Sequence, residues 1–589
     1  MHKKLLLGVE AIAQGAIDGG LSGVYAYPGT PSTEITEYIQ ANPLAKERNI
    51  HRDWSANEKT AMESAIGMSY AGKRAMVCMK HVGMNVCADA FVNSAITGVN
   101  GGLVVVAADD PEMHSSQNEQ DSRFYGDFAL IPILEPSNQQ EAYDMAYEAF
   151  ELSEKVGLPV LLRITTRLAH SRATVEEKPT KNQNENSQPQ HPRQFVLLPA
   201  IAKKRYAHLL SMQKEIEDIA ENSPYNRLED TPETKIGIIA SGIAYNYLVE
   251  NFNGHIPYPV LKIGQYPLPT KQIEYLKNKC EKIVVIEEGY PFIENKLRGI
   301  PADPKIKGKI DGTFPRQGEL NADITGKAFG ITPTQVYQPS NLVAARPPAL
   351  CTGCSHIDMY QVLNQVMEEY GSGKVFADIG CYTLGALPPY QAINSCVDMG
   401  ASITMAKGAS DAGIKNAVAV IGDSTFCHSG MTGLANIAYN QSNSTVIVLD
   451  NSITGMTGHQ QNPTTGYNLR GDPAGKIDLE ALCKALGIKR VRVCDPYNLE
   501  ETDKAVKEEL AVKEPSVIIS RRPCALLKYV KHNPPLRVNA EKCRSCKACM
   551  KLGCPSLSFK EGKAFVDKTQ CVGCGVCEQL CKFSAFEKN

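Results

Sequence analysis

Two runs of cysteines near the end of the chain are its strongest chemical signal. The first run comprises Cys543, Cys546, Cys549 and Cys554, with Pro555 directly after it, and the second comprises Cys571, Cys574, Cys577 and Cys581. Thiolates two residues apart around a tight loop can hold three corners of a [4Fe–4S] cluster. Zinc also favours paired cysteines, but eight cysteines in one short segment, with the cysteine–proline step, favour iron–sulfur clusters. The segment is therefore predicted to carry electrons.

The fourth cysteine of each run is expected to ligate the cluster of the other run. This crossed assignment gives the first cluster Cys543, Cys546, Cys549 and Cys581, and gives the second Cys571, Cys574, Cys577 and Cys554. Residues 550–553 make the spacer before the fourth cysteine of the first run one residue longer than usual, which is a small loop insertion. Between the runs, residues 557–566 alternate around a Glu–Gly turn and predict a β-hairpin.

A second group of polar residues follows two apolar, strand-like segments. Gly422, Asp423 and Ser424 come after the first of these strands, and Asp450 and Asn451 come at the end of the second. Open α/β sheets bind ligands at the carboxyl ends of their strands, and carboxylate and amide oxygens suit a Mg²⁺ ion that bridges a diphosphate. The glycine would let the backbone approach the phosphates closely. On these residues alone, two strand-end turns without a ligand are an equally good interpretation.

Composition and charge narrow the class of protein. The 589 residues carry a net charge of −2 and are 43% hydrophobic, which is ordinary for a globular protein. Without a strongly basic segment, nucleic acid is not expected as a partner, and no apolar run is long enough to cross a membrane. Glu10 interrupts the basic and leucine-rich start, which makes a poor export signal. Nineteen cysteines grouped as ligands indicate a reducing compartment, so the prediction is a cytoplasmic protein.

Strand-like and helix-like segments alternate through about the first five hundred residues, which predicts an α/β fold with largely parallel sheets. Expected strands are residues 23–27, 102–108, 159–164, 235–240, 282–287, 375–378, 417–422, 444–450 and 516–520. The predicted domains are residues 1–175, a linker and helical connector at 176–232, a middle α/β domain at 233–335, a diphosphate domain at 336–530, and a ferredoxin-like α+β domain at 531–589. The polar tract 178–190 is expected to be a mobile linker.

Two segments of the first domain resemble a known enzyme family. Residues 54–67, Trp-Ser-Ala-Asn-Glu-Lys-Thr-Ala-Met-Glu-Ser-Ala-Ile-Gly, resemble the helix whose glutamate binds the aminopyrimidine ring of thiamine diphosphate. Residues 27–35, Tyr-Pro-Gly-Thr-Pro-Ser-Thr-Glu-Ile, resemble the Tyr-Pro-x-Thr-Pro-Ser turn of 2-oxoacid:ferredoxin oxidoreductases. The spacing from Asp423 to Asn451 resembles the thiamine diphosphate signature, although Ser424 replaces its last glycine. With the cluster module, nearly the whole chain resembles the α subunit of the indolepyruvate-type members of this family.

The resemblance implies an activity and its components. The reaction would be the oxidative decarboxylation of arylpyruvates, indolepyruvate foremost, with coenzyme A, giving an arylacetyl-CoA and CO₂. Electrons would pass through the [4Fe–4S] clusters to ferredoxin, and the cofactors would include thiamine diphosphate and Mg²⁺. A smaller β subunit in an α₂β₂ assembly is implied as the partner. A non-oxidative thiamine enzyme would not need the eight cysteines. An electron-transfer subunit with relic thiamine domains would not need its cofactor residues.

The resemblance also implies roles for single residues. Glu58 would bind the aminopyrimidine ring, and Thr30 would lie at the substrate and the cofactor. Glu63 lies on another side of the same predicted helix and is the expected decoy. Gly422 and Ser424 would contact the cofactor. The ligands of Mg²⁺ would be Asp423, Asn451 and the main-chain carbonyl of Ile453.

For three further groups of residues, the sequence allows two interpretations each. Cys351, Cys354, Cys381 and Cys524 could hold a third cluster beside the thiamine, or could simply pack, because buried free cysteines are common. His459 is either near the cofactor or a structural loop histidine. Arg123 is either a clamp for the substrate carboxylate, since guanidinium pairs with carboxylate at two points, or a surface arginine in a salt bridge.

Overall fold

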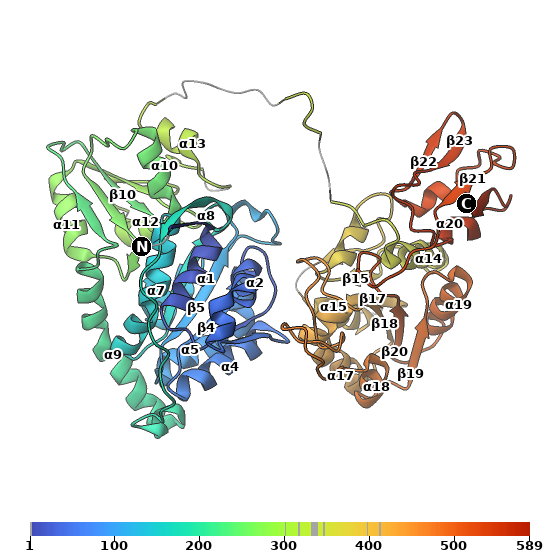
Figure 1. The fold of residues 1–589 in the computed structure, drawn as a ribbon, viewed down its shortest axis with the longest axis horizontal. Helices are drawn as coiled ribbons and strands as arrows, with labels where there is room; N and C mark the ends of the chain where they lie inside the picture. The colour runs from blue at the N-terminus through green and yellow to red at the C-terminus, as the bar shows by residue number, and fades with distance from the viewer. Residues whose placement is uncertain are drawn as a thin grey trace. The chain divides into compact units, whose positions relative to one another are not determined.

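The computed structural model describes residues 3–300, 302–315, 318–331, 340–344, 348–396, 399–411 and 414–588. The chain forms two compact units, Met1–Gln338 and Pro339–Asn589, which Figure 1 shows in blue to green and in yellow to red. No helix within the described ranges has the length and the apolar character that a membrane span requires.

A largely parallel sheet forms the centre of the first unit. Its seven strands within the described residues run in the order β12-β6-β7-β5-β4-β2-β3. They are β2 (Gly23–Ala26), β3 (His51–Trp54), β4 (Ala75–Lys80), β5 (Leu103–Asp109), β6 (Ile133–Leu134), β7 (Val160–Thr165) and β12 (Gln265–Tyr266). Every residue of β4, β5 and β7 is buried, as expected for parallel strands that helices cover on both faces. The three strands predicted here from apolar runs are confirmed.

Helices and one short 3₁₀ turn surround this sheet. They are α1 (Gly8–Asp18), α2 (Thr33–Ala41), α3 (Pro43–Glu47), α4 (Glu58–Tyr70), α5 (His81–Thr97), η1 (Pro111–Met113), α6 (Arg123–Ala129), α7 (Gln139–Val156) and α8 (Thr166–His170). An antiparallel ribbon joins β1 (Lys3–Leu7) to β8 (Arg172–Glu176). Helix α1 packs closely on α7, because a Cβ at Gly15 would lie only 2.3 Å from the carbonyl oxygen of Tyr143.

A second sheet completes the first unit. Its five strands in the part of the chain that is described run in the order β14-β13-β10-β11-β9, with only β9 antiparallel. They are β9 (Arg227–Glu229), β10 (Ile236–Ser241), β11 (Val260–Ile263), β13 (Lys282–Ile286) and β14 (Ile306–Lys307). The accompanying helices are η2 (Pro192–Phe195), α9 (Pro199–Glu221), α10 (Ile243–Asn251), α11 (Thr270–Lys279), α12 (Phe292–Arg298) and α13 (Ala322–Lys327).

Two strands cross the predicted limits of the middle domain. Strand β9 precedes residue 233 but pairs with β11, and β12 lies inside the predicted middle domain but pairs with β6 of the first sheet. The limit predicted between residues 335 and 336 lies outside the described residues. The domain boundaries therefore stay predictions.

The polar tract at 178–190 is fixed along much of its length. The main-chain N–H of Lys181 donates to the carbonyl of Asp18 at 2.7 Å, and that of Ser187 donates to the carbonyl of Ala71 at 2.9 Å. The guanidinium of Arg48 also holds the carbonyl of Lys181 at 2.6 Å. Backbone hydrogen bonds can hold a segment that is poor in apolar side chains. The prediction of a mobile linker is wrong for residues 178–187.

The second unit is built on a parallel sheet. Its six strands among the described residues run in the order β16-β15-β17-β18-β20-β19. They are β15 (Val375–Ala377), β16 (Ser395–Cys396), β17 (Ala417–Gly422), β18 (Ser444–Asp450), β19 (Arg490–Cys494) and β20 (Ser516–Arg521). The helices are α14 (Ser355–Tyr370), η3 (Cys381–Ala386), α15 (Ala401–Asp411), α16 (Asp423–Thr425), a π-helical turn η4 (Phe426–Gly430), α17 (Met431–Asn440), α18 (Leu479–Ala485) and α19 (Leu499–Leu510).

A small α+β module ends the second unit. Strand β21 (Leu536–Val538) pairs with β24 (Phe586–Lys588), and β22 (Leu557–Lys560) forms a hairpin with β23 (Lys563–Val566). Two short helical turns, η5 (Ala548–Leu552) and α20 (Val576–Gln579), complete the module. Positive φ angles at Glu561 (49°) and Gly562 (76°) give the hairpin the turn that matches strand twist. The predicted hairpin is confirmed.

Candidate functional site

The carboxyl ends of β17 and β18 bring the predicted magnesium ligands together. The two strands are parallel neighbours, with Gly422 opposite Leu449, so that Asp423 and Asp450 leave the same edge of the sheet. Asp423 exposes only 2% of its surface. Burial raises the pKa of Asp423 to about 7, and the nearby charge of Asp450 acts in the same direction. Asp450 is itself paired with Arg521 at 2.8 Å. A buried carboxylate beside a second one is a favourable setting for a divalent cation.

A loop closes over this edge and supplies residues that sequence patterns did not reveal. The main-chain N–H of Ile453 donates to Asn451 Oδ1 at 3.2 Å, and the hydroxyl of Thr464 lies 3.0 Å from Asp423 Oδ2. The hydroxyl of Thr454 donates to Ser424 Oγ at 2.9 Å. Thr454 and Thr464 have no distinctive spacing. Only the folding back of the loop, marked by the pairing of residues 454 and 460, reveals them.

The four scattered cysteines converge near the same edge. Cys351 and Cys354 lie at the start of α14, Cys381 begins η3 after β15, and Cys524 follows β20. Burial raises the pKa of Cys381 to about 11, and the charges of Cys524, Cys351 and Asp423 act in the same direction, so these groups lie close together. Burial also raises the pKa of the Cys354 thiol, and the charges of Cys381, Cys351 and Cys524 act in the same direction. The fold thus gathers thiols that are far apart in the sequence.

His459 lies beside this group of cysteines. Its Nε2 is 3.8 Å from Cys524 Sγ, and its backbone has a positive φ of 68° in an exposed part of the loop. The main-chain N–H of Cys524 also donates to the carbonyl of Asn451 at 2.9 Å, which ties the cysteine to the predicted magnesium edge. His459 therefore lies at the junction of the two groups.

The eight cysteines of the terminal module line two separate cavities. The first is lined by Cys543, Cys546, Cys549 and Cys581, and the second by Cys554, Cys571, Cys574 and Cys577. This is the grouping that the crossed ligation predicts. A hydrogen bond from the main-chain N–H of Ala564 lowers the pKa of the Cys543 thiol, which favours the thiolate that a metal requires. Main-chain N–H groups also lie 3.4 Å from the sulfurs of Cys571 and Cys581. Ligation itself stays a prediction.

In the first unit, the residues predicted for substrate and thiamine lie at the carboxyl edge of the seven-stranded sheet. Glu58 begins α4 and exposes 6% of its surface. Its side chain packs on α5, because a Cβ at Gly83 would lie 2.6 Å from Glu58 Cγ. Glu63 is exposed and pairs with Lys59, which agrees with its interpretation as a decoy. Thr30 follows β2, and its carbonyl accepts from the hydroxyl of Ser115 at 3.3 Å.

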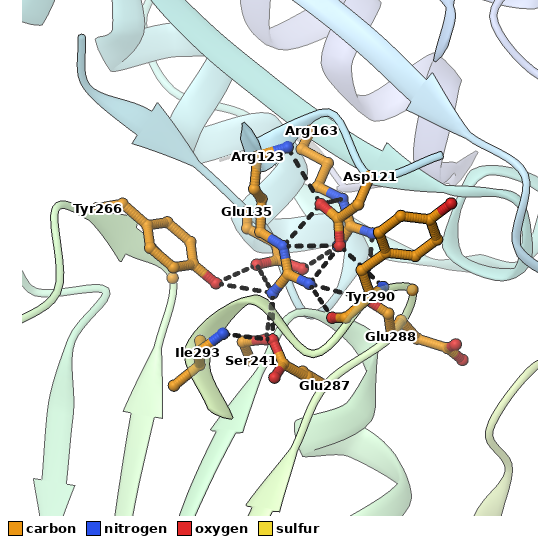
Figure 2. Close-up of polar contacts among 12 residues, drawn as sticks. Asp121, Arg123, Glu135, Arg163, Ser241, Tyr266, Glu287, Glu288, Tyr290 and Ile293 are labelled. Atoms are coloured by element: carbon orange, nitrogen blue, oxygen red, sulfur yellow. Dashed lines mark hydrogen bonds and ion pairs between the residues drawn. The ribbon is translucent and has the colours of Figure 1, made fainter. Parts of the chain in front are cut away.

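Arg123 forms salt bridges, as its alternative interpretation predicted, but it does so in the interior and not at the surface. The side chain is fully buried between the first sheet and the middle sheet, where Figure 2 shows it surrounded by acidic groups. It pairs with Asp121, with Glu287 at 3.0 Å and with Glu135 at 3.7 Å. Arg163 neutralises the other side of the same cluster through Asp109 and Glu135. Carboxylates of this chain therefore occupy the guanidinium of Arg123, which is neither at the surface nor available as a clamp.

The cluster around Arg123 has a definite charge pattern. Burial tends to raise the pKa of Asp121, but Arg123 and Arg163 outweigh burial and lower it to about 2. Burial raises the pKa of Glu287, and Arg123 only partly opposes this. Glu287 also accepts from the main-chain N–H groups of Ile293 and Glu294 at 2.9 and 3.0 Å. The cluster joins the two sheets of the first unit through buried ion pairs.

Comparison with known proteins matches a segment of each unit to a thiamine diphosphate-binding family. Residues 14–225 match the family described as pyruvate flavodoxin/ferredoxin oxidoreductase, thiamine diphosphate-binding, and residues 378–520 match the C-terminal binding domain of thiamine pyrophosphate enzymes. Indolepyruvate oxidoreductase subunit IorA of Archaeoglobus fulgidus is 40% identical, with 100% of this chain and 97% of the relative covered. The same subunit of Pyrococcus horikoshii is 39% identical over 100% of this chain and 97% of the relative. A solved 2-oxoglutarate:ferredoxin oxidoreductase from Magnetococcus marinus aligns with a TM-score of 0.47 and 17% identity, over 56% of this chain and 65% of that one.

Proposed function

The chain belongs to the family of indolepyruvate oxidoreductase IorA subunits, and on that premise we propose that it oxidatively decarboxylates arylpyruvates. The family and its thiamine-binding domains make it an oxidoreductase of 2-oxoacids that uses thiamine diphosphate. The proposal adds the substrate, indolepyruvate foremost, and coenzyme A as the acceptor of the acyl group. It also adds [4Fe–4S] clusters that pass electrons to ferredoxin.

The residues at the β17–β18 edge fit the cofactor. Asp423, Asn451 and the main-chain carbonyl of Ile453 would hold Mg²⁺ and, through it, the diphosphate, because hard oxygen ligands suit this ion. Gly422 and Ser424 would lie along the diphosphate. Thiamine diphosphate supplies a nucleophilic carbon for the 2-oxo group and a place for the electrons that remain once CO₂ has left.

Glu58 would hold the aminopyrimidine ring of the cofactor. Its carboxylate is buried at the start of α4 and packed against Gly83, so its direction is fixed by two helices. A carboxylate held in this way can orient the aminopyrimidine ring and assist in moving its proton. Thr30, in the turn after the neighbouring strand β2, would lie at the substrate and the cofactor.

The observation that best supports electron transfer is the placement of the cysteines. One compact unit contains the proposed diphosphate edge, the four cysteines beside it and two cavities, each lined by four cysteines. The two cavities would hold [4Fe–4S] clusters with the crossed ligation. Cys351, Cys354, Cys381 and Cys524 would hold a third cluster, next to the thiamine, where electrons first leave the substrate.

The proposal includes a partner. The relatives are named as subunits, which supports a second, smaller β subunit, and we propose an α₂β₂ assembly with ferredoxin as the external acceptor.

An anaerobic experiment tests the function. The reconstituted complex is mixed with thiamine diphosphate, Mg²⁺, coenzyme A and indolepyruvate, and the visible absorbance of the clusters is followed. Bleaching that requires both thiamine diphosphate and indolepyruvate supports the proposal. Bleaching with pyruvate or a branched 2-oxoacid, but not with indolepyruvate, would replace the substrate. Lack of bleaching with every 2-oxoacid would overturn the proposed reaction.

Matched variants separate the roles of the residues. Glu58→Gln should abolish bleaching and leave the iron content unchanged, while Glu63→Gln, on the same helix but exposed, should bleach like the parent protein. Cys381→Ala should lower the iron content by one cluster if the third cluster exists. Unchanged iron in that variant would refute the third cluster and leave the other two in place.

A further inference from the structure

The guanidinium of Arg123 is occupied by carboxylates of this chain. A different cation, Lys80, lies at the edge of the first sheet where the substrate is predicted to bind. Lys80 is the last residue of β4 and precedes α5, and it exposes only 9% of its surface. Its Nζ donates to the carbonyl of Ser115 at 2.5 Å and lies 3.3 Å from the hydroxyl of that residue. The same hydroxyl contacts the carbonyl of Thr30. A Cβ at Gly29 would lie 3.2 Å from Lys80 Cβ. The ammonium group therefore lies against the Thr30 turn.

Lys80 differs from several other buried cations in lacking an anionic partner. Arg74, Arg123, Arg163 and Lys262 each form an ion pair with a carboxylate. Within the described residues, no carboxylate oxygen lies within 4.0 Å of Lys80 Nζ. The charge of Asp110 acts on Lys80, but the oxygens of Asp110 accept from Ser115, Ser116 and Thr166. Burial lowers the pKa of Lys80 to about 8, and the charge of Asp110 opposes this only in part.

The start of α5 adds a second feature that points to a ligand. His81 is completely buried, its Nε2 lies 3.1 Å from the carbonyl of Asn118, and its Nδ1 has no hydrogen-bond partner in the described structure. The first N–H groups of a helix also favour an anion. Gly83, which packs on Glu58, lies in α5, three residues after Lys80. Lys80 therefore lies three residues from the glycine on which the proposed thiamine-binding carboxylate packs.

We propose that Lys80 binds the carboxylate of the 2-oxoacid substrate, between the Thr30 turn and the start of α5. This inference rests on the proposed function and names the group that recognises the substrate. A buried cation without a counter-ion gains most when an anion arrives, because the site has already lost the water that would screen the charge. The substrate carboxylate would take the place of the missing partner, and the 2-oxo carbon would then face the side of the site where Glu58 lies.

Binding of a stable analogue tests the proposal apart from turnover. Indole-3-lactate keeps the carboxylate of indolepyruvate but lacks the 2-oxo group, and its Kd is measured by calorimetry on the anaerobic complex with thiamine diphosphate. Lys80→Met should raise this Kd, and the KM for indolepyruvate, at least about tenfold, since it removes a charge-assisted contact. Lys80→Arg should keep most of the affinity. Lys59→Met removes an exposed cation from the same domain and should change neither value.

Two further readouts exclude a structural role. The affinity for thiamine diphosphate should be the same in Lys80→Met and in the parent protein. The Kd of indole-3-lactate should weaken above pH about 8 in the parent as Lys80 loses its proton, but not in Lys80→Arg, whose cation persists. An unchanged Kd in Lys80→Met, or an equal loss of thiamine diphosphate binding, would overturn the proposal. Failure of the parent to bleach with any 2-oxoacid would overturn the reaction instead, while the lactate titration would still report on Lys80.

Discussion

Replacing Arg123 by methionine should destabilise the first unit strongly. Methionine fills much of the same volume but removes a guanidinium that is fully buried. The change leaves Glu287 without its cation at 3.0 Å and removes one of the two cations that hold Asp121. The carbonyls of Glu288 and Tyr290, each 3.1 Å from Arg123 Nη2, also lose a donor.

The size of the effect follows from which groups are left unpaired. Removing one partner of a buried ion pair costs about 3–5 kcal/mol, because the other charge stays in a medium of low polarity. Arg163 still neutralises Asp121 and Glu135 in part, at 3.6 Å for Asp121, so the loss should not exceed this range. Glu287 keeps its two main-chain donors, Ile293 and Glu294. We expect the free energy of unfolding to fall by about 3–5 kcal/mol.

The pH dependence gives the sharper test. In the parent protein burial already raises the pKa of Glu287 although Arg123 opposes it. Without Arg123, the pKa of Glu287 in the folded state should rise further above that of the unfolded chain, and the pKa of Asp121 should rise from its low value, because only Arg163 then remains beside it. The folded variant then binds more protons than the unfolded one, so its stability increases as the pH falls. The difference from the parent should be larger at pH about 8 than at pH about 5.

The assay can use a built-in probe. Trp54 is the only tryptophan of the chain and lies in β3 of the first unit, so its fluorescence in a urea titration reports on the unit that contains Arg123. Adding Glu287→Gln to Arg123→Met removes the stranded charge and should recover part of the loss. Lys214→Met, which breaks an exposed pair with Asp218, should leave the midpoint unchanged. A loss below about 1 kcal/mol, the value of a surface pair, or one that grows toward low pH, would refute this reasoning.

Three other changes should separate the cofactor sites. Cys554→Ala should remove the iron of the second cavity, and Cys546→Ala that of the first, as followed by iron analysis and electron paramagnetic resonance; loss of the same signal in both would contradict the crossed ligation. Asp423→Asn should abolish Mg²⁺-dependent binding of thiamine diphosphate in calorimetry without loss of iron, and retained binding would argue against Asp423 as a ligand. Gly83→Ala should push Glu58 out of place, because a Cβ would lie 2.6 Å from Glu58 Cγ, and should lower kcat by about 10²-fold without a matching loss of stability.

The strands could be predicted because a buried parallel strand is a continuous apolar run. Strand β5, Leu-Val-Val-Val-Ala-Ala-Asp, and β18, Ser-Thr-Val-Ile-Val-Leu-Asp, are buried at every position, and both were recognisable from composition alone. Short edge strands carry no such signal. Strand β12 has two residues and β9 has three. They are recognised as strands only through their pairing with β6 and β11. These two strands are also the ones that cross the predicted limits of the middle domain.

Composition was a poor guide to order and to the burial of charge. The tract at 178–187 has the composition of a linker, but main-chain groups of Asp18 and Ala71 hold it, and composition cannot reveal backbone partners. Arg123 was judged by its neighbours in sequence. Glu287, which directly follows β13 of the other sheet, determines its environment together with Glu135. Ion pairs between distant segments require the tertiary structure.

In the candidate sites, too, some residues could be predicted from the sequence and others only from the fold. Asp423 and Asn451 could be found because each directly follows a strand, and neighbouring parallel strands end at one edge. The eight terminal cysteines could be found because spacing and ligation are linked in a short segment. Lys80 ends a strand, but a lysine there is ordinary, and what distinguishes it is the carboxylate that it lacks. A missing counter-ion is a property of the space around a charge. It can be recognised only once the fold shows that Asp110, whose charge acts on Lys80, is already bound to Ser115, Ser116 and Thr166, which leaves the ammonium group available to a substrate.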